Sequence, residues 1–284
     1  MSLQEKNYWL TTVDFPTKES RLLPDRIDVA VIGAGFTGLS AARTLAKRGA
    51  KVAVLESETI GWGASSRNGG MVLTGMKLGV NQLISKYGRE LTRRMYAASL
   101  ETIDCVEQII REETIDCDFL RCGHLEVACK QKHFDDYARQ AEVIAREFNH
   151  QLRVVQKNEL SAEIGSTIYH GGMVDEVSAG LNPARYVAGL GRAAMKAGAE
   201  VLERTRVEGI ERAAHQGEQG WKIITSGGTL WAREVFVATS GYTSHATPAL
   251  QRKIIPIGSF IITTEILPET LTHELSPQIG RAHV

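Results

Sequence analysis

The sequence lacks the features that would place it in a membrane, on a nucleic acid or in a secretory pathway. Its 284 residues contain no apolar run of the length that a bilayer crossing needs, about 18 residues. The 33 basic and 33 acidic side chains cancel, and no long charged run offers a surface to nucleic acid. The first residues lack the basic-then-apolar pattern of a secretory signal. We therefore expect a cytoplasmic globular protein without a nucleic-acid or membrane partner.

Cysteine is also scarce, and its spacing excludes two further classes of protein. The four cysteines, at positions 105, 117, 122 and 129, form no C-x-x-C pair and have no paired histidines nearby. So few cysteines in so long a chain do not make a disulfide scaffold. The pattern predicts reduced thiols and no metal site.

What the sequence does contain is a glycine-rich turn between two apolar segments. Asp28 to Ile32 has the composition of a buried parallel strand, and the motif Gly33-x-Gly35-x-x-Gly38 follows it directly. A helix-forming run then extends from Leu39 to Lys47. A second apolar strand, from Lys51 to Leu55, ends at Glu56. The order predicts a strand–turn–helix–strand unit with an acidic residue at its end.

Each residue type in this unit has a physical reason to be there. Gly33 permits the tight turn, Gly35 lets a pyrophosphate approach the backbone, and Gly38 lets the helix and strand pack closely. The N–H groups and dipole at the start of the helix attract phosphates. Glu56 follows Gly38 by 18 residues and can accept hydrogen bonds from a ribose diol. We predict a dinucleotide site; an ordinary glycine-rich turn is the alternative.

A second stretch, Ile60 to Met71, is also rich in glycine and serine, so a regular strand or a long helix is not expected there. It offers backbone N–H groups, two hydroxyls, a guanidinium and an amide, which suit a ligand with phosphates and a ring. Arg67 and Asn68 have side chains that would hold an anion or the edge of a flavin. A flexible surface turn is the alternative.

The rest of the chain predicts two interleaved domains. A long amphipathic helix is expected from Arg89 to about Glu113, after a loop over residues 76 to 90. Separate strands are expected at Thr229–Ala232 and at Glu234–Ala238, and an extended β-branched run is expected at Ile254–Glu265. The chain is predicted to leave the nucleotide domain, build part of a second domain, and return.

The two glycine-rich stretches and Glu56 together resemble the FAD-dependent amine oxidoreductases, the superfamily of D-amino-acid oxidase, glycine oxidase and sarcosine oxidase. The loop Gly-Ala-Ser-Ser-Arg-Asn-Gly-Gly is similar to that of the gamma-glutamylputrescine oxidoreductase-like branch, and the resemblance runs from about Tyr8 to Pro277. It implies an α/β fold, in which a Rossmann-like FAD-binding domain (26–75 and 183–243) is interleaved with an α+β substrate domain on a mixed sheet (76–182 and 244–278).

The resemblance also implies which residues contact FAD. The pyrophosphate would lie on the first motif, the adenosine ribose on Glu56, and the pyrophosphate, ribityl chain and flavin ring along the second stretch. The adenine would meet the backbone of Val207, and the end of a later strand would pass near the pyrophosphate. The implied residues are Gly33, Ala34, Gly35, Phe36, Thr37, Gly38, Glu56, Ala64, Ser65, Ser66, Arg67, Asn68, Gly69, Gly70, Met71, Val207, Ala238, Thr239 and Ser240.

Two departures from the family pattern carry expectations of their own. Some relatives attach FAD covalently through a histidine where this chain has Arg67, so we expect non-covalent FAD. Relatives also continue beyond the length of this chain with a portion that completes the substrate domain, so the chain is expected to be C-terminally truncated. Its last residues, Ile279 to Val284, resemble a translated sequencing adapter, and we expect them to be a non-native tail.

The implied activity is oxidation of a C–N bond of an amine or amino acid by hydride transfer to flavin N5, with O₂ or another acceptor. No nucleophile–base pair or carboxylate pair in the sequence identifies a catalytic residue. Two alternatives remain open. One is an NAD-linked dehydrogenase, and the other is an inactive FAD- or nucleotide-binding fragment of a longer enzyme. The sequence predicts neither the particular substrate nor an oligomeric state.

Overall fold

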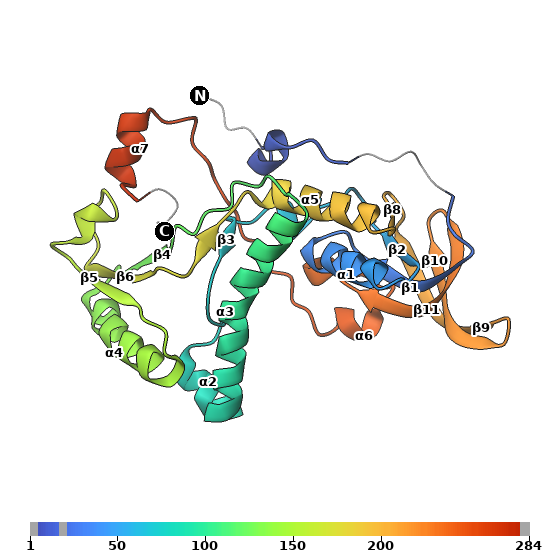
Figure 1. Cartoon of the computed structure of the whole chain (residues 1–284), viewed down its shortest axis with the longest axis horizontal. Helices are drawn as coiled ribbons and strands as arrows, with labels where there is room; N and C mark the ends of the chain where they lie inside the picture. Colours follow the sequence, from blue (N-terminus) through green and yellow to red (C-terminus); the bar gives the residue numbers. More distant parts are fainter. Residues whose placement is uncertain (1–4, 17–21, 279–284) are drawn as a thin grey trace. The chain divides into compact units, whose positions relative to one another are not determined.

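The computed structural model describes residues 5–16 and 22–278, and the chain folds into two compact units (Figure 1). The first unit comprises Met1–Gly69, Glu113–Cys117 and Pro183–Ile262. The second comprises Gly70–Glu112, Asp118–Asn182 and Thr263–Val284. The assignment of a FAD-binding and a substrate domain to particular ranges stays a prediction. The expected tail, Ile279 to Val284, lies outside the described residues.

The first unit is built on a six-stranded mixed sheet with the order β8-β2-β1-β11-β10-β9. The first four strands in this order run parallel, and β10 pairs antiparallel with both β11 and β9. A central β1 between two parallel neighbours is the arrangement of a Rossmann-like sheet. The strands are β1 (Arg26–Ile32), β2 (Val52–Leu55), β8 (Glu200–Leu202), β9 (Val207–His215), β10 (Glu218–Thr225) and β11 (Gly228–Val237).

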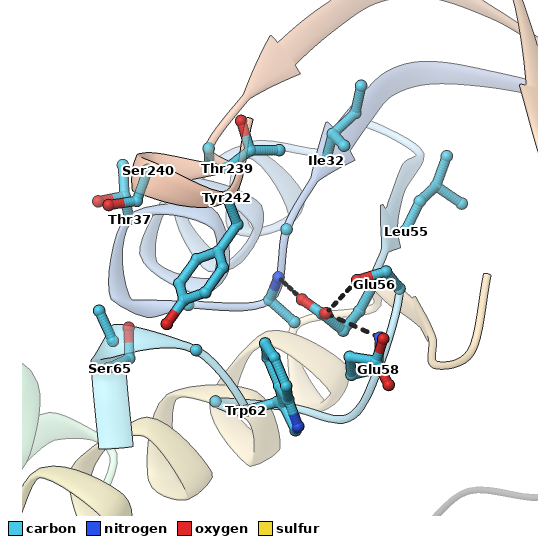
Figure 2. Close-up of a pocket in the computed structure, with 18 of the residues that line it drawn as sticks. Ile32, Thr37, Leu55, Glu56, Glu58, Trp62, Ser65, Thr239, Ser240 and Tyr242 are labelled. Atoms are coloured by element: carbon cyan, nitrogen blue, oxygen red, sulfur yellow. Dashed lines mark hydrogen bonds between the residues drawn. The ribbon is translucent and has the colours of Figure 1, made fainter. Parts of the chain in front are cut away.

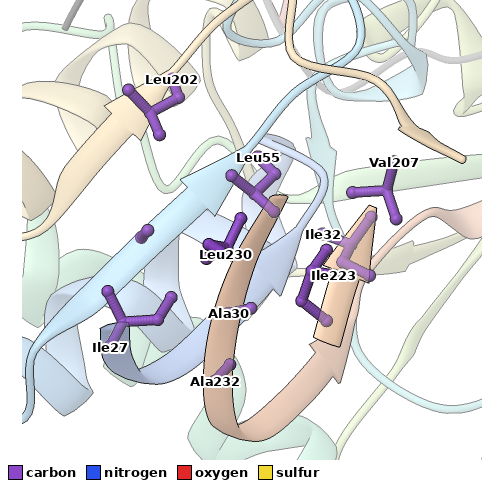
Figure 3. Packing of buried hydrophobic residues seen from close by; sticks show 10 residues of the cluster. Ile27, Ala30, Ile32, Leu55, Leu202, Val207, Ile223, Leu230 and Ala232 are labelled. Atoms are coloured by element: carbon purple, nitrogen blue, oxygen red, sulfur yellow. The ribbon is translucent and has the colours of Figure 1, made fainter. Parts of the chain in front are cut away.

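Apolar side chains of all six strands form one core on the sheet. Ile27, Leu55, Leu202, Ile223 and Leu230 are all buried and pack together, as Figure 3 shows. Because parallel strands are covered on both faces, they carry almost continuous apolar runs. This is why β1 and β2 could be identified in the sequence.

Helices α1 (Phe36–Lys47) and α5 (Pro183–Lys196) belong to the same unit and pack against each other. Their buried residues include several small ones, among them Gly38, Ala42 and Ala188. The short segment Glu113–Cys117 joins this unit through a buried ion pair, in which Glu113 Oε1 lies 2.7 Å from Arg43 Nη2.

The second unit contains a three-stranded antiparallel sheet, a two-stranded ribbon and several helices. The sheet has the order β4-β6-β5, and β3 pairs with β7 in the ribbon. Among the described residues, no helix combines the length and apolarity needed to cross a membrane. The elements are β3 (Met71–Val72), α2 (Val80–Tyr87), α3 (Arg89–Glu112), β4 (His124–Val127), α4 (Gln131–Phe148), β5 (Arg153–Gln156), β6 (Gly171–Asp175), β7 (Ala179–Gly180) and α7 (Glu269–Leu275).

The structure corrects three local predictions. Residues 80–87 form helix α2 instead of a loop; the helix is short and buries only Leu83, so its periodic signal is weak. The two strands expected on either side of Arg233 are one strand, β11, because the exposed Arg233 interrupts the apolar pattern without ending the strand. Residues 254–265 form no strand, and Phe260 there is 93% exposed.

A buried polar network connects several parts of the second unit. His150 Nε2 lies 3.0 Å from Asp175 Oδ1, and the Tyr96 hydroxyl lies 2.9 Å from His150 Nδ1. Asp175 Oδ2 accepts hydrogen bonds from the Thr74 and Ser178 hydroxyls. Burial raises the pKa of Tyr96 to about 12, so this phenol keeps its proton and can donate it to His150. The network fixes the loop before α2, helix α3 and the end of β6 to one another.

Acid is expected to destabilise the second unit through Asp175. Burial raises the pKa of this carboxyl, but hydrogen bonds from His150, Thr74 and the Val177 N–H outweigh it and lower the pKa from 3.8 to about 2. Because the folded pKa lies below the unfolded one, the carboxylate stabilises the fold above about pH 4, and this contribution is lost as the pH falls towards about 2.

Urea unfolding at about pH 5 and about pH 3 measures this effect. Asp175→Asn should cost about 1–3 kcal/mol at the higher pH and reduce the loss of stability between the two. Asp136→Asn, at a half-exposed site on α4, is the matched control. An equal pH dependence in Asp175→Asn and the parent chain would contradict the prediction.

Candidate functional site

A cavity of about 490 Å³ in the first unit is lined by the residues at and just beyond the carboxyl ends of β1, β2 and β11 (Figure 2). This is the edge at which open α/β sheets bind ligands, and the volume is in the range of small-molecule sites. Its lining is Ile32, Gly33, Ala34, Gly35, Phe36, Thr37, Leu55, Glu56, Ser57, Glu58, Gly61, Trp62, Gly63, Ala64, Ser65, Asn68, Arg206, Val207, Ala238, Thr239, Ser240, Tyr242 and Ser244.

The turn between β1 and α1 has the close contacts that require glycine. Gly33 has a φ of +103°, and a Cβ there would lie 2.7 Å from the Ala238 carbonyl oxygen. A Cβ at Gly38 would lie 1.9 Å from the Gly33 carbonyl oxygen, so only glycine lets α1 start this close to the strand. A Cβ at Gly35 would lie 2.8 Å from Ser65 Oγ. The missing side chain at Gly35 leaves the backbone open towards the cavity.

Glu56 is held in place by backbone donors. Its Oε2 accepts a hydrogen bond of 2.7 Å from the Ala34 N–H, and its Oε1 accepts one of 3.0 Å from the Glu58 N–H (Figure 2). The Ser57 hydroxyl also donates to Oε1, at 3.3 Å. A carboxylate has about four acceptor positions, so these three bonds orient Glu56 and leave about one position for a further donor. A ribose hydroxyl is such a donor.

The second glycine-rich stretch is folded back onto the start of α1. Ser65 Oγ accepts a 3.0 Å hydrogen bond from the Phe36 N–H, the first amide of that helix. The Asn68 side chain donates to the Ala64 and Ser65 carbonyls, and the buried Ser66 carbonyl accepts from Asn7. This loop therefore has a defined conformation next to the glycine turn.

Most of the predicted site residues come together in the cavity. Those in its lining are Gly33, Ala34, Gly35, Phe36, Thr37, Glu56, Ala64, Ser65, Asn68, Val207, Ala238, Thr239 and Ser240. The others lie outside the lining: Gly38, Ser66, Arg67, Gly69, Gly70 and Met71. Their roles as FAD contacts stay predictions.

The residues outside the lining have other places in the structure. Gly38 packs against the turn, and the exposed Arg67 lies over the Trp62 ring, with Cζ 4.5 Å from the ring centroid. Gly70 and Met71 belong to the second unit, where the Gly70 carbonyl accepts from the Leu181 N–H and Met71 begins β3.

Several lining residues were missed by the sequence analysis, chiefly Glu58, Trp62, Arg206 and Tyr242. Arg206 Nη2 lies 3.1 Å from Glu58 Oε1, so these two side chains meet at the edge of the cavity beside Glu56 and Val207. Each missed residue is within four positions of a predicted one, but its side chain direction is set by the tertiary fold. No group of three metal-ligating side chains occurs among residues 5–16 and 22–278.

The four parallel strands, the glycine turn and the oriented Glu56 carboxylate are the features of a dinucleotide-binding α/β protein. Comparison with known proteins specifies the family: residues 28–282 match the FAD dependent oxidoreductase family, and the chain belongs to it. The predicted family, α/β fold class and FAD cofactor are thereby confirmed. The glycine cradle and Glu56 fit the pyrophosphate and ribose of that cofactor.

Two curated relatives and one solved structure illustrate the similarity. The chain is 33% identical to the probable oxidoreductase OrdL of Haemophilus influenzae, over 87% of this chain and 57% of that protein. It is 32% identical to gamma-glutamylputrescine oxidoreductase of Escherichia coli, over 88% and 58%. The crystal structure of glycine oxidase from Geobacillus kaustophilus matches with a TM-score of 0.65 and 25% identity, over 80% and 59%. The chain thus spans less than two thirds of the length of these proteins.

Gly35→Ala is expected to weaken FAD binding without unfolding the protein. The new Cβ would lie 2.8 Å from Ser65 Oγ and would occupy the space that the turn leaves open, while the φ of −88° suits alanine. We expect the Kd for FAD, measured by flavin fluorescence, to rise about tenfold or more. Gly79→Ala, where a Cβ meets nothing within 4 Å, is the control. Equal affinities of the two variants would contradict the prediction.

Glu56→Gln tests the ribose site separately. The amide keeps the shape of the side chain, but its nitrogen cannot accept hydrogen bonds, so a bond to the Ala34 N–H or to the ribose is lost. Because hydrogen bonds to a charged group are worth about 1.5–3 kcal/mol, the Kd for FAD should rise roughly 10- to 100-fold. Glu208→Gln, at an exposed position of β9, should leave the Kd for FAD unchanged.

Proposed function

We propose that this chain forms the FAD-binding part, and a portion of the substrate-binding part, of an oxidoreductase that oxidises a C–N bond of an amine or amino acid. The observation that carries the proposal is the cavity in which the Gly33–Gly35 turn, Ser65 and Glu56 converge. The missing side chain at Gly35 gives a pyrophosphate access to the backbone, and the Glu56 carboxylate can accept from a ribose hydroxyl. Family membership makes FAD the dinucleotide.

The substrate class is supported by the relatives. Gamma-glutamylputrescine oxidoreductase and glycine oxidase carry an amine and an amino acid in their names, and they match 88% and 82% of this chain. We infer a small amine or amino-acid substrate for this protein too. The residues proposed for the substrate domain are 76–182 and 244–278.

The chemistry divides between cofactor and protein. When bound, the flavin would supply the redox chemistry, hydride transfer from the substrate C–N bond to N5, with O₂ or another acceptor as the final oxidant. The protein's part is placement. The start of α1 offsets the pyrophosphate charge and Glu56 orients the ribose, which together fix where the rest of the cofactor extends.

Arg67 is given no part in this proposal. Its predicted contact with an anion or a flavin edge stays a prediction; in the structure the guanidinium lies over the Trp62 ring, outside the cavity lining. No catalytic residue is proposed, because the described contacts include no group tied to a reacting atom.

Competition between nucleotides tests the proposal. Because the cavity residues fit the adenosine diphosphate half of FAD, ADP should compete with FAD for the purified chain, and FMN, which lacks this half, should not. Binding should saturate near one FAD per chain and give a yellow protein. NAD binding with no uptake of FAD would support the NAD-linked alternative, and FMN competing as well as ADP would contradict the site assignment.

Anaerobic mixing of the FAD-loaded protein with amines and amino acids tests the reaction itself. Loss of the oxidised flavin absorbance with a substrate, but not with its alcohol analogue, is the expected result. Its recovery on admitting air would identify O₂ as an acceptor. Stoichiometric FAD binding without any reduction across the panel would instead support an inactive FAD-binding fragment.

A further inference from the structure

Two aromatic residues of the cavity lining lie on loops that are far apart in the sequence. Trp62 is in the loop after β2, and Tyr242 is in the short 3-10 helix Ser240–Tyr242 after β11. Their ring centroids are 5.6 Å apart and their planes are inclined by 64°, an edge-to-face contact. In Figure 2 both rings project into the space between Glu56 and Ser65.

The order of the strands places the Trp62–Tyr242 contact across the glycine turn. β1 lies between β2 and β11, so the loops that follow β2 and β11 flank the glycine turn that follows β1. A contact between those two loops therefore passes across the turn at which a pyrophosphate would bind. Gly33, Gly35 and the aromatic pair all line the same cavity.

Gly63 and Arg67, in the same loop as Trp62, contact the two rings. A Cβ at Gly63 would lie 2.9 Å from Tyr242 Cε2, so the tyrosine ring rests directly on the backbone next to Trp62. Arg67 lies over the Trp62 ring with Cζ 4.5 Å from its centroid, a cation–π contact within the same loop. These contacts keep Trp62 directed to the cavity although the loop has little regular structure.

The pair is not part of the hydrophobic core. Trp62 is 37% exposed and Tyr242 is 53% exposed, whereas the core residue Trp231 is 6% exposed. A ligand that fills the cavity would bury further surface of both rings, which favours its binding. The pair therefore offers apolar contact area to a ligand of this cavity.

We propose that Trp62 and Tyr242 form an aromatic clasp that closes over the FAD pyrophosphate and its adjoining ribose and slows release of the cofactor. The inference rests on the proposed function, because it takes FAD to be the ligand of this cavity. The clasp makes no covalent bond and takes part in no redox step. It acts on the dissociation rate, since the Trp62–Tyr242 contact must open before a dinucleotide can leave.

The test measures FAD association and dissociation rates by stopped-flow flavin fluorescence. Trp62→Ala and Tyr242→Ala should each raise the dissociation rate about tenfold, with an unchanged or faster association rate. The double variant should add little to either single one, because one ring alone cannot form the contact. Tyr242→Phe keeps the ring and should retain slow dissociation.

A pair of arginine variants provides the matched control. Arg67→Ala removes the cation–π contact on Trp62 and should speed dissociation, by less than loss of the ring itself. Arg212→Ala removes a similar contact, 4.2 Å from the Trp221 ring on β10, away from the cavity, and should leave the rate unchanged. Thermal melting of each apoprotein reports whether a variant has merely lost stability.

The outcomes separate this inference from the proposed function. If the parent chain does not bind FAD, the proposed function fails. If the parent binds FAD but the alanine variants release it within about twofold of the parent rate, the clasp is wrong and the function stands. Lower melting temperatures with unchanged dissociation rates would likewise assign Trp62 and Tyr242 a structural role only.

Discussion

The close approach of α1 to the end of β1 is the constraint on which the first unit depends. Gly38 lies so near the Gly33 carbonyl that any side chain would collide with it. This approach places the start of α1 at the edge of the cavity and sets the position of the helix that packs on α5. The order of β2, β1 and β11 then places one loop on each side of the turn. The contact between Gly38 and Gly33 thus determines both the position of the cavity and the packing of α1 in the core.

The two units are stabilised in different ways. The sheet of the first unit has an apolar core that includes Leu55, Ile223 and Leu230. The second unit has smaller apolar clusters together with a buried chain of hydrogen bonds from Tyr96 through His150 to Asp175. Apolar packing tolerates small rearrangements, whereas a buried carboxylate with several donors accepts few alternatives. Asp175 therefore specifies one arrangement of its neighbours as well as stabilising it.

The sequence predicted the parts of the site whose function depends on the backbone. Glycines with forced close contacts, an acid at a fixed distance and apolar parallel strands leave a local signal, and β1, α1, β2 and Glu56 were found by it. The role of Arg67 stays a prediction. Three lining residues were missed: Trp62, Arg206 and Tyr242. The directions of these side chains depend on contacts across more than 100 residues, such as that between Trp62 and Tyr242, which no local pattern records. Helix α2 was missed because a single buried leucine gives no periodicity.

The hydrogen bond between the Ala34 N–H and Glu56 has a consequence for the energetics of ligand binding. It ties the residue that would hold the ribose to the turn that would hold the phosphates. A ligand group that shifts either partner must shift the other, so the two halves of an adenosine diphosphate are not recognised independently. Adenosine and pyrophosphate, bound as separate molecules, would each change the affinity of the site for the other by the same factor, as thermodynamic linkage requires. The cavity is in this sense one cooperative site with two chemically distinct ends.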